Sequence, residues 1–513
     1  MVRPQLTPTG GSHLGSLPAP SRLHWTVAAG LLGLAIILRV MLFQGYRDSD
    51  PRDYAILADD LARGRLQIDA YDGPAIFPLR YGLYAPTALL IRTFGLSEIT
   101  IAAFPFLISI ANCVLAYALS RRLFGPLAGL IGLAALAVLP IDIAMASLLY
   151  PDPPAAFWAN LGIAALVFSG SPVSASAGIL AGLCFGISWL TKESVVYLAP
   201  LVAIFFCGWV RAPPRRALRT SLYVGGASLC IVAGEAAIYK ATVGDWLFHF
   251  HALERNYAQT AVWFFDQSSP LFGWPEGGYH KALAKRLLLA GPKAVAMSFS
   301  GLPIIALIAI VWAIVTKDRR FITPAVWFMF LLAMFNFGSS SVTSYKPLPL
   351  FERYLYPLLL PAIVLTSGLL TVTLKEKSHM RSAQFGAATV VLIYLASCAL
   401  GAARLTSRPV QMVRDAMTKI GPTDVLFTDY RTAASFVFLR TGSLRAADTT
   451  TIAYEQLRPD DMPARSYVFI HSTKVASMAQ VDGYRSPDFV HSPPQTWRRI
   501  WSAPGGMLFY ISN

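Results

Sequence analysis

Three aspartates follow directly on the first long apolar run of the sequence. They are Asp48, Asp50 and Asp53, in the stretch RDSDPRDYAILADDLARG at residues 47–64. Carboxylates at a membrane edge are costly unless they are paired, solvated or used in chemistry. Asp50 and Tyr54 are one helical turn apart, which predicts a short helix with Asp50 at its N-terminal end. Capping and solvation of that helix is the alternative to a chemical role for these acids.

Two further stretches place charges at the ends of apolar runs. YPDPPAAFW sets Asp152 between prolines just before a helix starts, where capping is the alternative to a site. WLTKES sets Lys192 beside Glu193. A lysine at this end of a span runs against the positive-inside trend, so a binding role for Lys192 is favoured over snorkelling.

Arginines and tyrosines occur together in two more stretches of this kind. FPLRYGLYAP contains Arg80 and Tyr81, and LFERYLYP contains Glu352, Arg353 and Tyr354. The alternative for each stretch is an ordinary interfacial arginine beside an aromatic belt.

The composition indicates that helices crossing a membrane carry these residues. The chain has 513 residues, of which 55% are hydrophobic and only 14% charged, a balance typical of an integral membrane protein. Basic loops on one side of a membrane explain the net charge of +15 better than nucleic-acid binding, because no basic stripe with interleaved aromatics occurs. The five cysteines lie in apolar runs without the paired spacing of a disulfide framework or a zinc site.

Apolar runs near the bilayer-crossing length of about 20 residues predict about eleven spans. With the N-terminus in the cytoplasm, the basic loops collect on the cytoplasmic side and the acidic segments on the other. The outer side then receives segments 44–97 and 240–291 and everything after residue 404. The expected spans are residues 25–43, 98–119, 127–145, 154–169, 176–190, 194–210, 221–239, 293–315, 321–337, 354–373 and 384–404.

The chain is thus expected to have three parts. These are a disordered cytoplasmic N-terminus at 1–24, a membrane domain at 25–404 and a small extracytoplasmic α/β domain at 405–513. In the last part DVLFTDY, SYVFIHS, WRRIWSA and GMLFYIS read as strands separated by turn residues. RPVQMVRDAMTKIG reads as a helix ending at Gly421.

The predicted topology brings the polar ends of the spans to one side of one membrane. There, arginines and a lysine would surround an anion near several carboxylates. Such a site suits attack on a sugar carried by a phosphate, because cations stabilise the departing phosphate while a carboxylate takes the proton of the attacking hydroxyl. Arginine matches phosphate oxygens with its fork, and lysine acts as a point charge.

The stretch DPRDYAILADDLARG resembles the Asp-x-x-x-Tyr-x-x-x-Ala…Gly pattern that follows the first helix of the GT-C membrane glycosyltransferases. LLYPDPPAAFW, LTKES, TVGDWLFHF and RYLYPLLLP follow in family order. Residues 25–370 are therefore similar to the relatives of dolichyl-phosphate-mannose protein mannosyltransferases and of the bacterial lipid A aminoarabinose transferase. The resemblance implies a GT-C fold and transfer of a hexose or pentose from a polyprenyl phosphate, usually with inversion, on the periplasmic or lumenal side.

What the resemblance implies extends to the setting of the enzyme. The loops are compact and carry no inserted sugar-binding module, which favours a bacterial enzyme of the inner membrane. The acceptors of such relatives include lipid A, other envelope glycolipids and proteins. The sequence does not choose among these acceptors.

The resemblance also implies roles for individual residues. Asp50 matches the general base, and Asp152 matches a second acid that helps to orient the acceptor. Lys192, Arg80 and Arg353 match positions that hold the donor phosphate, although RYGLYAP lacks the Pro-Pro pair of many relatives. The other candidates for this site are Asp48, Asp53, Tyr54, Tyr81, Glu193, Lys346, Glu352, Tyr354 and His249.

Metal binding and the role of the second outer segment stay open in the sequence. Asp50 and Asp152 would hold a divalent cation if the fold brings them together, whereas a monophosphate flanked by arginine and lysine needs none. His249 and His251 form a lone His-x-His, for which a structural role is favoured over metal binding. The rest of segment 240–291 reads as amphipathic helix on the membrane, serving either as a lid or as packing.

Two other classes of function compete with a single-sugar transferase. A transporter or flippase for a lipid-linked sugar usually has internal repeats, interrupted helices and charges at the midplane, which the sequence does not show. A polymerase or ligase of lipid-linked glycans also uses arginines on the outer face but usually lacks an acidic first outer segment. The sequence therefore favours the transferase.

Overall fold

The structure, a computed structural model, describes most of the chain. Asp48 and Lys346 fall outside the described residues, and for Glu352 only the backbone is described. The described residues are 21–46, 49–69, 71, 74–170, 172–208, 213–264, 301–338, 352–375, 389, 391–392, 394–401, 409–445, 450–455, 457–472, 474–476, 478 and 485–512.

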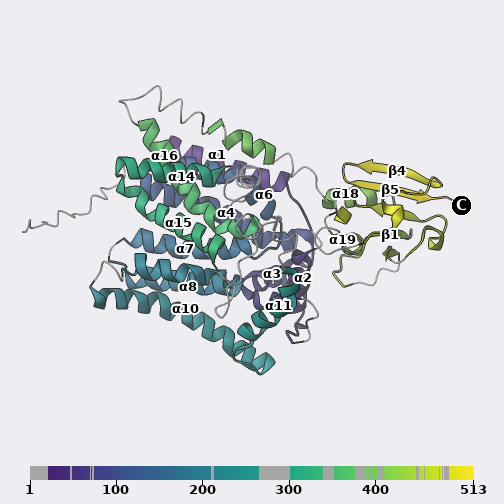
Figure 1. Ribbon diagram of the computed structural model, residues 1–513, viewed down its shortest axis with the longest axis horizontal. Coiled ribbons are helices and arrows are strands. Elements are labelled where there is room, and N and C mark those ends of the chain that lie inside the picture. The colour runs from purple at the N-terminus through teal and green to yellow at the C-terminus, as the bar shows by residue number, and fades with distance from the viewer. Residues whose placement is uncertain are drawn as a thin grey trace, which may run out of the picture.

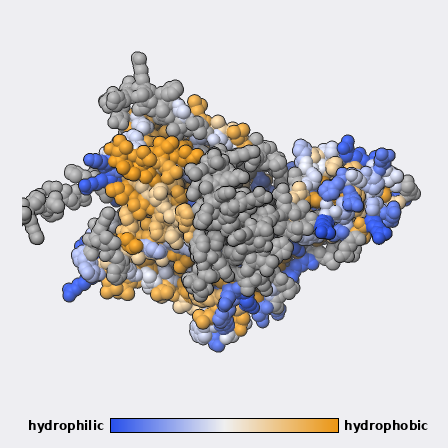
Figure 2. Space-filling view, viewed as in Figure 1, coloured by the Kyte–Doolittle hydropathy of each residue, from blue (hydrophilic) through white to orange (hydrophobic). Residues whose placement is uncertain are grey.

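A bundle of long helices forms the larger part of the molecule, and a small α/β unit extends from one end of it (Figure 1). In the described part of the chain, five helices are long and apolar enough to cross a membrane, and four shorter apolar helices accompany them. Apolar side chains form a broad band over the bundle on the face seen in Figure 2. The mainly helical fold is as predicted, whereas the count of about eleven crossings is not confirmed. The bundle helices are α1 (Arg22–Met41), α4 (Glu98–Phe124), α5 (Pro126–Ala137), α7 (Asp152–Ser169), α8 (Ala175–Thr191), α10 (Pro214–Val243), α14 (Leu302–Thr316), α15 (Ile322–Phe337) and α16 (Leu359–Lys375).

Basic and aromatic side chains meet at the end of the bundle away from the α/β unit. Arg121 lies over the ring of Trp25 at 5.6 Å, and Arg320 lies over the ring of Phe124 at 5.9 Å. Both arginines belong to loops that the sequence assigns to the cytoplasmic side. Which compartment this end faces stays a prediction.

The predicted span 127–145 is broken in two. α5 ends at Ala137, and α6 (Pro140–Met145) begins after Leu139, whose backbone is extended. A residue before proline is pushed out of the helical region, so Pro140 accounts for the break. The break brings Asp142 into the bundle interior, where it is fully buried.

Short helices cover the end of the bundle that carries the acidic segments. α2 (Asp50–Ala62) begins at Asp50, as the spacing predicts, and buries Tyr54 against Phe77 with ring centroids 4.7 Å apart. α11 (Phe248–Phe264) is the described part of the expected second outer helix; residues 265–291 of that prediction lie outside the described ranges. The other short helices at this end are η1 (Phe77–Leu79), α3 (Tyr81–Phe94), η2 (Glu193–Leu198) and η6 (Glu352–Leu358). α9 (Ala199–Leu201) and η3 (Val202–Phe206) continue η2 as one short apolar segment, and η5 (Arg319–Phe321) lies at the opposite end with Arg320.

The C-terminal unit contains one five-stranded sheet with the strand order β2-β1-β3-β5-β4. β1 pairs in parallel with β2 and β3, and β5 pairs antiparallel with β3 and β4. The four predicted strands are present, and the short strand β2 was not predicted. α18 ends at Met417, before the expected Gly421. The elements are α18 (Pro409–Met417), β1 (Leu426–Thr428), α19 (Tyr430–Thr441), β2 (Thr451–Ala453), η7 (Pro459–Asp461), β3 (Tyr467–Ile470), η8 (Asp488–Val490), β4 (Trp497–Ala503) and β5 (Gly506–Ile511).

Ion pairs and one aromatic contact dock the α/β unit on the acidic end of the bundle. Arg414 pairs with Glu98 at the start of α4. Arg445 pairs with Asp60 of α2 at 2.5 Å. The rings of Phe438 and Tyr46 lie 4.4 Å apart. The unit therefore contacts the same helix that carries Asp50.

Glycines of α8 allow a close approach to α10. Gly178, Gly182 and Gly186 recur at every fourth residue and so share one face of α8. A Cβ atom on Gly182 would lie 2.2 Å from the carbonyl oxygen of Val224. Small residues of this kind are typical of close helix pairs in membranes.

We expect Gly182→Ala to separate α8 from α10 and to lower the thermal melting temperature of the detergent-solubilised protein. Overpacking of this kind costs about 1–3 kcal/mol. Gly226→Ala in α10 is the control, because a Cβ there would meet no atom within 4 Å. Equal melting temperatures for the two variants would contradict the close packing of the helices.

Candidate active site

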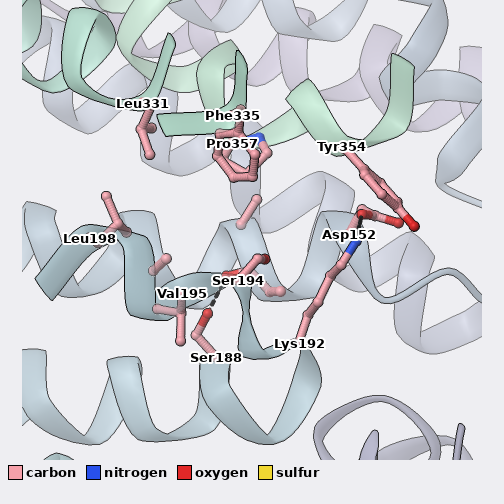
Figure 3. A pocket seen from close by; sticks show the side chains of 13 residues that line it. Asp152, Ser188, Lys192, Ser194, Val195, Leu198, Leu331, Phe335, Tyr354 and Pro357 are labelled. Atoms are coloured by element: carbon pink, nitrogen blue, oxygen red, sulfur yellow. Dashed lines mark hydrogen bonds and ion pairs between the residues drawn. The ribbon is translucent and has the colours of Figure 1, made fainter. Parts of the chain in front are cut away.

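Residues far apart in the sequence meet at the acidic end of the bundle. Asp50 starts α2, Asp152 starts α7, and Lys192 follows the last residue of α8. Arg353 and Tyr354 lie on η6. Figure 3 shows Lys192 and Asp152 pointing toward each other beside Tyr354.

Arg353 lies between two carboxylates. Its Nη2 donates to Asp50 Oδ2 at 2.9 Å, and its Nε lies 3.9 Å from Asp152 Oδ2. Its guanidinium also lies over the ring of Tyr150, 4.6 Å from the centroid. The side chain of Arg353 is 22% exposed and that of Asp50 is 30% exposed, so solvent reaches both.

Lys192 makes the second ion pair of the site. Its Nζ lies 2.5 Å from Asp152 Oδ1 and 3.6 Å from the ring centroid of Tyr354. The side chains of Lys192 and Asp152 are only 12% and 4% exposed, which strengthens their attraction. Tyr354 also lies 5.7 Å from Arg353, so this ring borders both cations.

The four charged groups Asp50, Asp152, Lys192 and Arg353 balance each other. Two carboxylates face two cations when no ligand is bound, which lowers the cost of burying them at the end of a bundle. An entering anion could replace a carboxylate as the partner of either cation. The cluster is therefore suited to binding and releasing a phosphate.

Arg80 is engaged by a different partner. It donates to both carboxylate oxygens of Glu193, and its side chain is 3% exposed. Gly82 packs directly on Thr191, with a built Cβ only 2.2 Å from its Oγ1. These contacts fix the start of α3 beside the segment that carries Lys192. A phosphate contact from Arg80, as the resemblance implies, would need this pair to open.

The two tyrosine candidates differ in their surroundings. Tyr54 is 2% exposed on α2. Burial holds its pKa well above the usual range, and the charges of Arg80, Asp50, Arg353 and Asp152 act on it as well. Tyr54 therefore stays a neutral phenol next to the charged cluster. Tyr81 instead packs with tilted rings against Tyr84 and Tyr239, with centroids 5.0 Å and 5.9 Å away.

His249 belongs to a separate buried cluster. Its Nδ1 lies 2.9 Å from Glu235, and its ring stacks on Trp189 with centroids 4.5 Å apart. His251 is exposed and pairs with Asp245 at 2.7 Å, so the two histidines do not share a ligand. The described residues contain no group of three or more His, Cys, Asp or Glu side chains that could hold a metal ion.

A narrow cavity extends from the Lys192–Asp152 pair into the bundle (Figure 3). About 20 Å³ of it is open to water-sized groups, which is room for about one water molecule. One end is charged and the other is apolar. Its lining is Asp152, Ala155, Ala156, Ala159, Ser188, Lys192, Ser194, Val195, Leu198, Leu331, Phe335, Tyr354 and Pro357.

Several parts of this site have no counterpart among the predicted residues. Tyr150, the ring under Arg353, is the first residue of the YPDPP stretch, where an aromatic at a membrane edge was the available signal. A buried Arg39–Asp142 pair also reaches η6 through Tyr356. The sequence feature that could have indicated this pair is the lone arginine inside the first apolar run.

The chain resembles known proteins in sequence and in fold. Residues 84–237 match the family model of dolichyl-phosphate-mannose-protein mannosyltransferase. The oligosaccharyltransferase of Archaeoglobus fulgidus, tethered with an acceptor peptide containing the NVT sequon, aligns with 96% of this chain and 74% of its own, with a TM-score of 0.54 and 13% identity. ArnT from Cupriavidus metallidurans aligns with 95% of this chain and 98% of its own, with a TM-score of 0.49 and 15% identity in the apo state. Its form bound to undecaprenyl phosphate gives the same TM-score with 14% identity.

No curated protein sequence matches the chain. The resemblance to the GT-C glycosyltransferases is nevertheless confirmed, by the mannosyltransferase model and by the fold shared with the archaeal enzyme. At 13% identity that structural likeness establishes the fold and not the substrate.

Asp53, one turn after Asp50, has a raised pKa. Burial raises its pKa to about 6, and the nearby Asp50 charge adds to the rise, while Arg52 and Arg431 oppose it. The folded protein thus keeps a proton on Asp53 at pH values at which an unfolded chain, with a pKa of about 4, has lost it. Stability contributed by this proton is therefore full below about pH 4 and is lost as the pH rises to about 6.

We expect Asp53→Asn to remove this pH dependence. The melting temperature of the variant minus that of the wild type should increase from pH 4 to about pH 6 and then level off. Asp69→Asn is the control, since it removes an exposed carboxylate of the same segment. A difference that stays constant over this window would contradict a raised pKa of Asp53.

Proposed function

We propose that the protein transfers a single sugar from a polyprenyl phosphate to an acceptor hydroxyl, with Asp50 as the general base. The observation that carries this proposal is the position of Arg353 between Asp50 and Asp152, beside Lys192. A base and two phosphate-binding cations stand within one cluster, which is what displacement of a sugar phosphate requires. The matching family, dolichyl-phosphate-mannose-protein mannosyltransferase, supports a lipid phosphate as the donor.

The donor phosphate would enter the cluster as the new partner of the cations. Arg353 would turn its guanidinium from Asp50 to the phosphate oxygens, and Lys192 would add a point charge. This exchange frees the Asp50 carboxylate from its cation, so that it can accept the proton of the acceptor hydroxyl. Donor binding would thus activate the base in the same step.

The chemical step is then a direct displacement. The acceptor oxygen forms a bond to the anomeric carbon while the bond from that carbon to the phosphate oxygen breaks. Asp50 takes the proton of the acceptor hydroxyl, and the polyprenyl phosphate leaves with the bonding electrons, its charge held by Arg353 and Lys192. One displacement inverts the anomeric carbon. Asp152 would keep both cations in place and help to orient the acceptor.

The apolar part of the cavity supports a lipid donor. Beyond the Lys192–Asp152 pair it is lined by Ala155, Leu331 and Phe335, which offer no charge to a ligand. An isoprenoid chain needs such a surface next to the site that holds its phosphate. Since the cavity has room for only about one water molecule, we expect donor entry to part the helices that line it.

The compartment and the acceptor belong to the same proposal. The membrane helices and the charged site at one end of them support a multi-pass protein acting at one membrane surface. We place that surface outside the cytoplasm, in a bacterial inner membrane, with an envelope glycolipid or a protein as acceptor. The basic residues at the opposite end of the bundle support this orientation.

Asp50→Asn should abolish transfer while leaving the fold and donor binding intact. Loss of the general base is expected to lower kcat by about 10²–10⁴-fold. The assay incubates the purified protein with undecaprenyl-phosphate [³H]mannose and envelope extract, and measures label in new glycosides. Asp245→Asn is the control, since Asp245 pairs with His251 outside the cluster.

The same assay separates the competing functions. One labelled sugar per acceptor supports the transferase, while a polymer indicates a polymerase or ligase. Labelled donor that crosses vesicle membranes without forming a glycoside indicates a flippase. Turnover of Asp50→Asn at the wild-type rate would contradict the assignment of the base.

A further inference from the structure

Another ion pair lies inside the bundle, deeper than the candidate active site. Arg39 near the end of α1 pairs with Asp142 of α6, and neither side chain is exposed to solvent. Burying two charges in this way is expensive and is compensated only when the geometry and the additional hydrogen bonds are good. The surroundings of both side chains meet that condition.

Every N–H group of Arg39 has an acceptor. Its Nε donates to Ser109 Oγ at 2.5 Å, and its Nη1 donates to the carbonyl oxygens of Ala35 at 3.0 Å and Ala137 at 3.1 Å. Its Nη2 donates to the Leu136 carbonyl at 3.2 Å and to Asp142. The carbonyl groups of residues 136 and 137 lie in the last turn of α5, where the N–H partner four residues on is missing. Arg39 therefore ties α1, α4 and the broken end of α5 together.

Asp142 links Arg39 to η6. Its Oδ2 accepts from Arg39 and Ser109, and its Oδ1 accepts from the Tyr356 hydroxyl. Tyr356 is 3% exposed and stands three residues after Arg353 on the same short helix. η6 also packs against α7 and α15, and the Tyr356 hydroxyl adds a polar anchor for it on the bundle interior.

We propose that Tyr356, held by the Arg39–Asp142 pair, is a positioning residue that sets Arg353 for binding the donor phosphate. This inference rests on the proposed function, because it assumes that Arg353 binds that phosphate. The anchor fixes the backbone of η6 and thereby the start of the Arg353 side chain. Small displacements of a group that orients a substrate have large effects on binding and rate.

Tyr356→Phe tests the inference, because it removes one hydroxyl and leaves the Arg39–Asp142–Ser109 contacts in place. We expect the Kd for undecaprenyl phosphate, measured on the protein in nanodiscs, to rise by about tenfold. The kcat of mannosyl transfer from undecaprenyl-phosphate mannose should fall by a similar factor. Tyr394→Phe is the matched control, since Tyr394 is also buried but its hydroxyl donates to the Ala135 carbonyl of α5. That control should leave the Kd within about twofold of the wild type, with melting temperatures of the two variants alike.

A double variant shows whether Tyr356 acts through Arg353. Arg353→Lys alone should weaken lipid binding, and adding Tyr356→Phe to it should change the Kd little further. Tyr356→Phe with a wild-type Kd, a Kd increase equal to that of Tyr394→Phe, or full additivity with Arg353→Lys would each overturn the inference. Wild-type protein that binds no undecaprenyl phosphate would instead contradict the proposed function, and the inference with it.

Discussion

Arg353 lies between Asp50 and Asp152, and the rest of the candidate site is arranged around that contact. A guanidinium shared by two carboxylates leaves one negative charge over, which Lys192 neutralises through Asp152. The cluster can thus exist without a ligand at modest cost, and an anion that enters has cations ready to receive it. Asp50 and Asp152 compete with the donor phosphate for Arg353 and Lys192. Binding of the phosphate is therefore coupled to release of the base, Asp50.

The shape of the bundle follows from the need to bring these partners together. Each charged residue starts or ends a different helix, where the backbone can turn and the side chain can reach its neighbours. The Gly182 face lets α8 approach α10 closely, and the break before Pro140 turns Asp142 inward. The α/β unit adds contacts to α2 and α4 at the same end through Arg445 and Arg414. The architecture therefore supports the acidic end of the molecule from both sides.

Local patterns predicted much of this arrangement. The four-residue spacing of Asp50 and Tyr54 predicted the start of α2, and the prolines beside Asp152 predicted the start of α7. The sequence could not reveal which charges would pair, because Arg353 and Asp50 are separated by 303 positions and adjacent residues do not determine such contacts. Thus Arg80 was expected on the phosphate and is found on Glu193. The strand β2 was missed because it lies in the polar stretch DTTTIAYEQ, which lacks the apolar run that marks the equally short β1.

The most direct test of the account is an experimental structure of the protein with undecaprenyl phosphate bound. The account predicts the phosphate between Arg353 and Lys192, with the guanidinium withdrawn from Asp50 and the first isoprene units along Leu331 and Phe335. A phosphate bound elsewhere while the Arg353–Asp50 pair stays closed would contradict it.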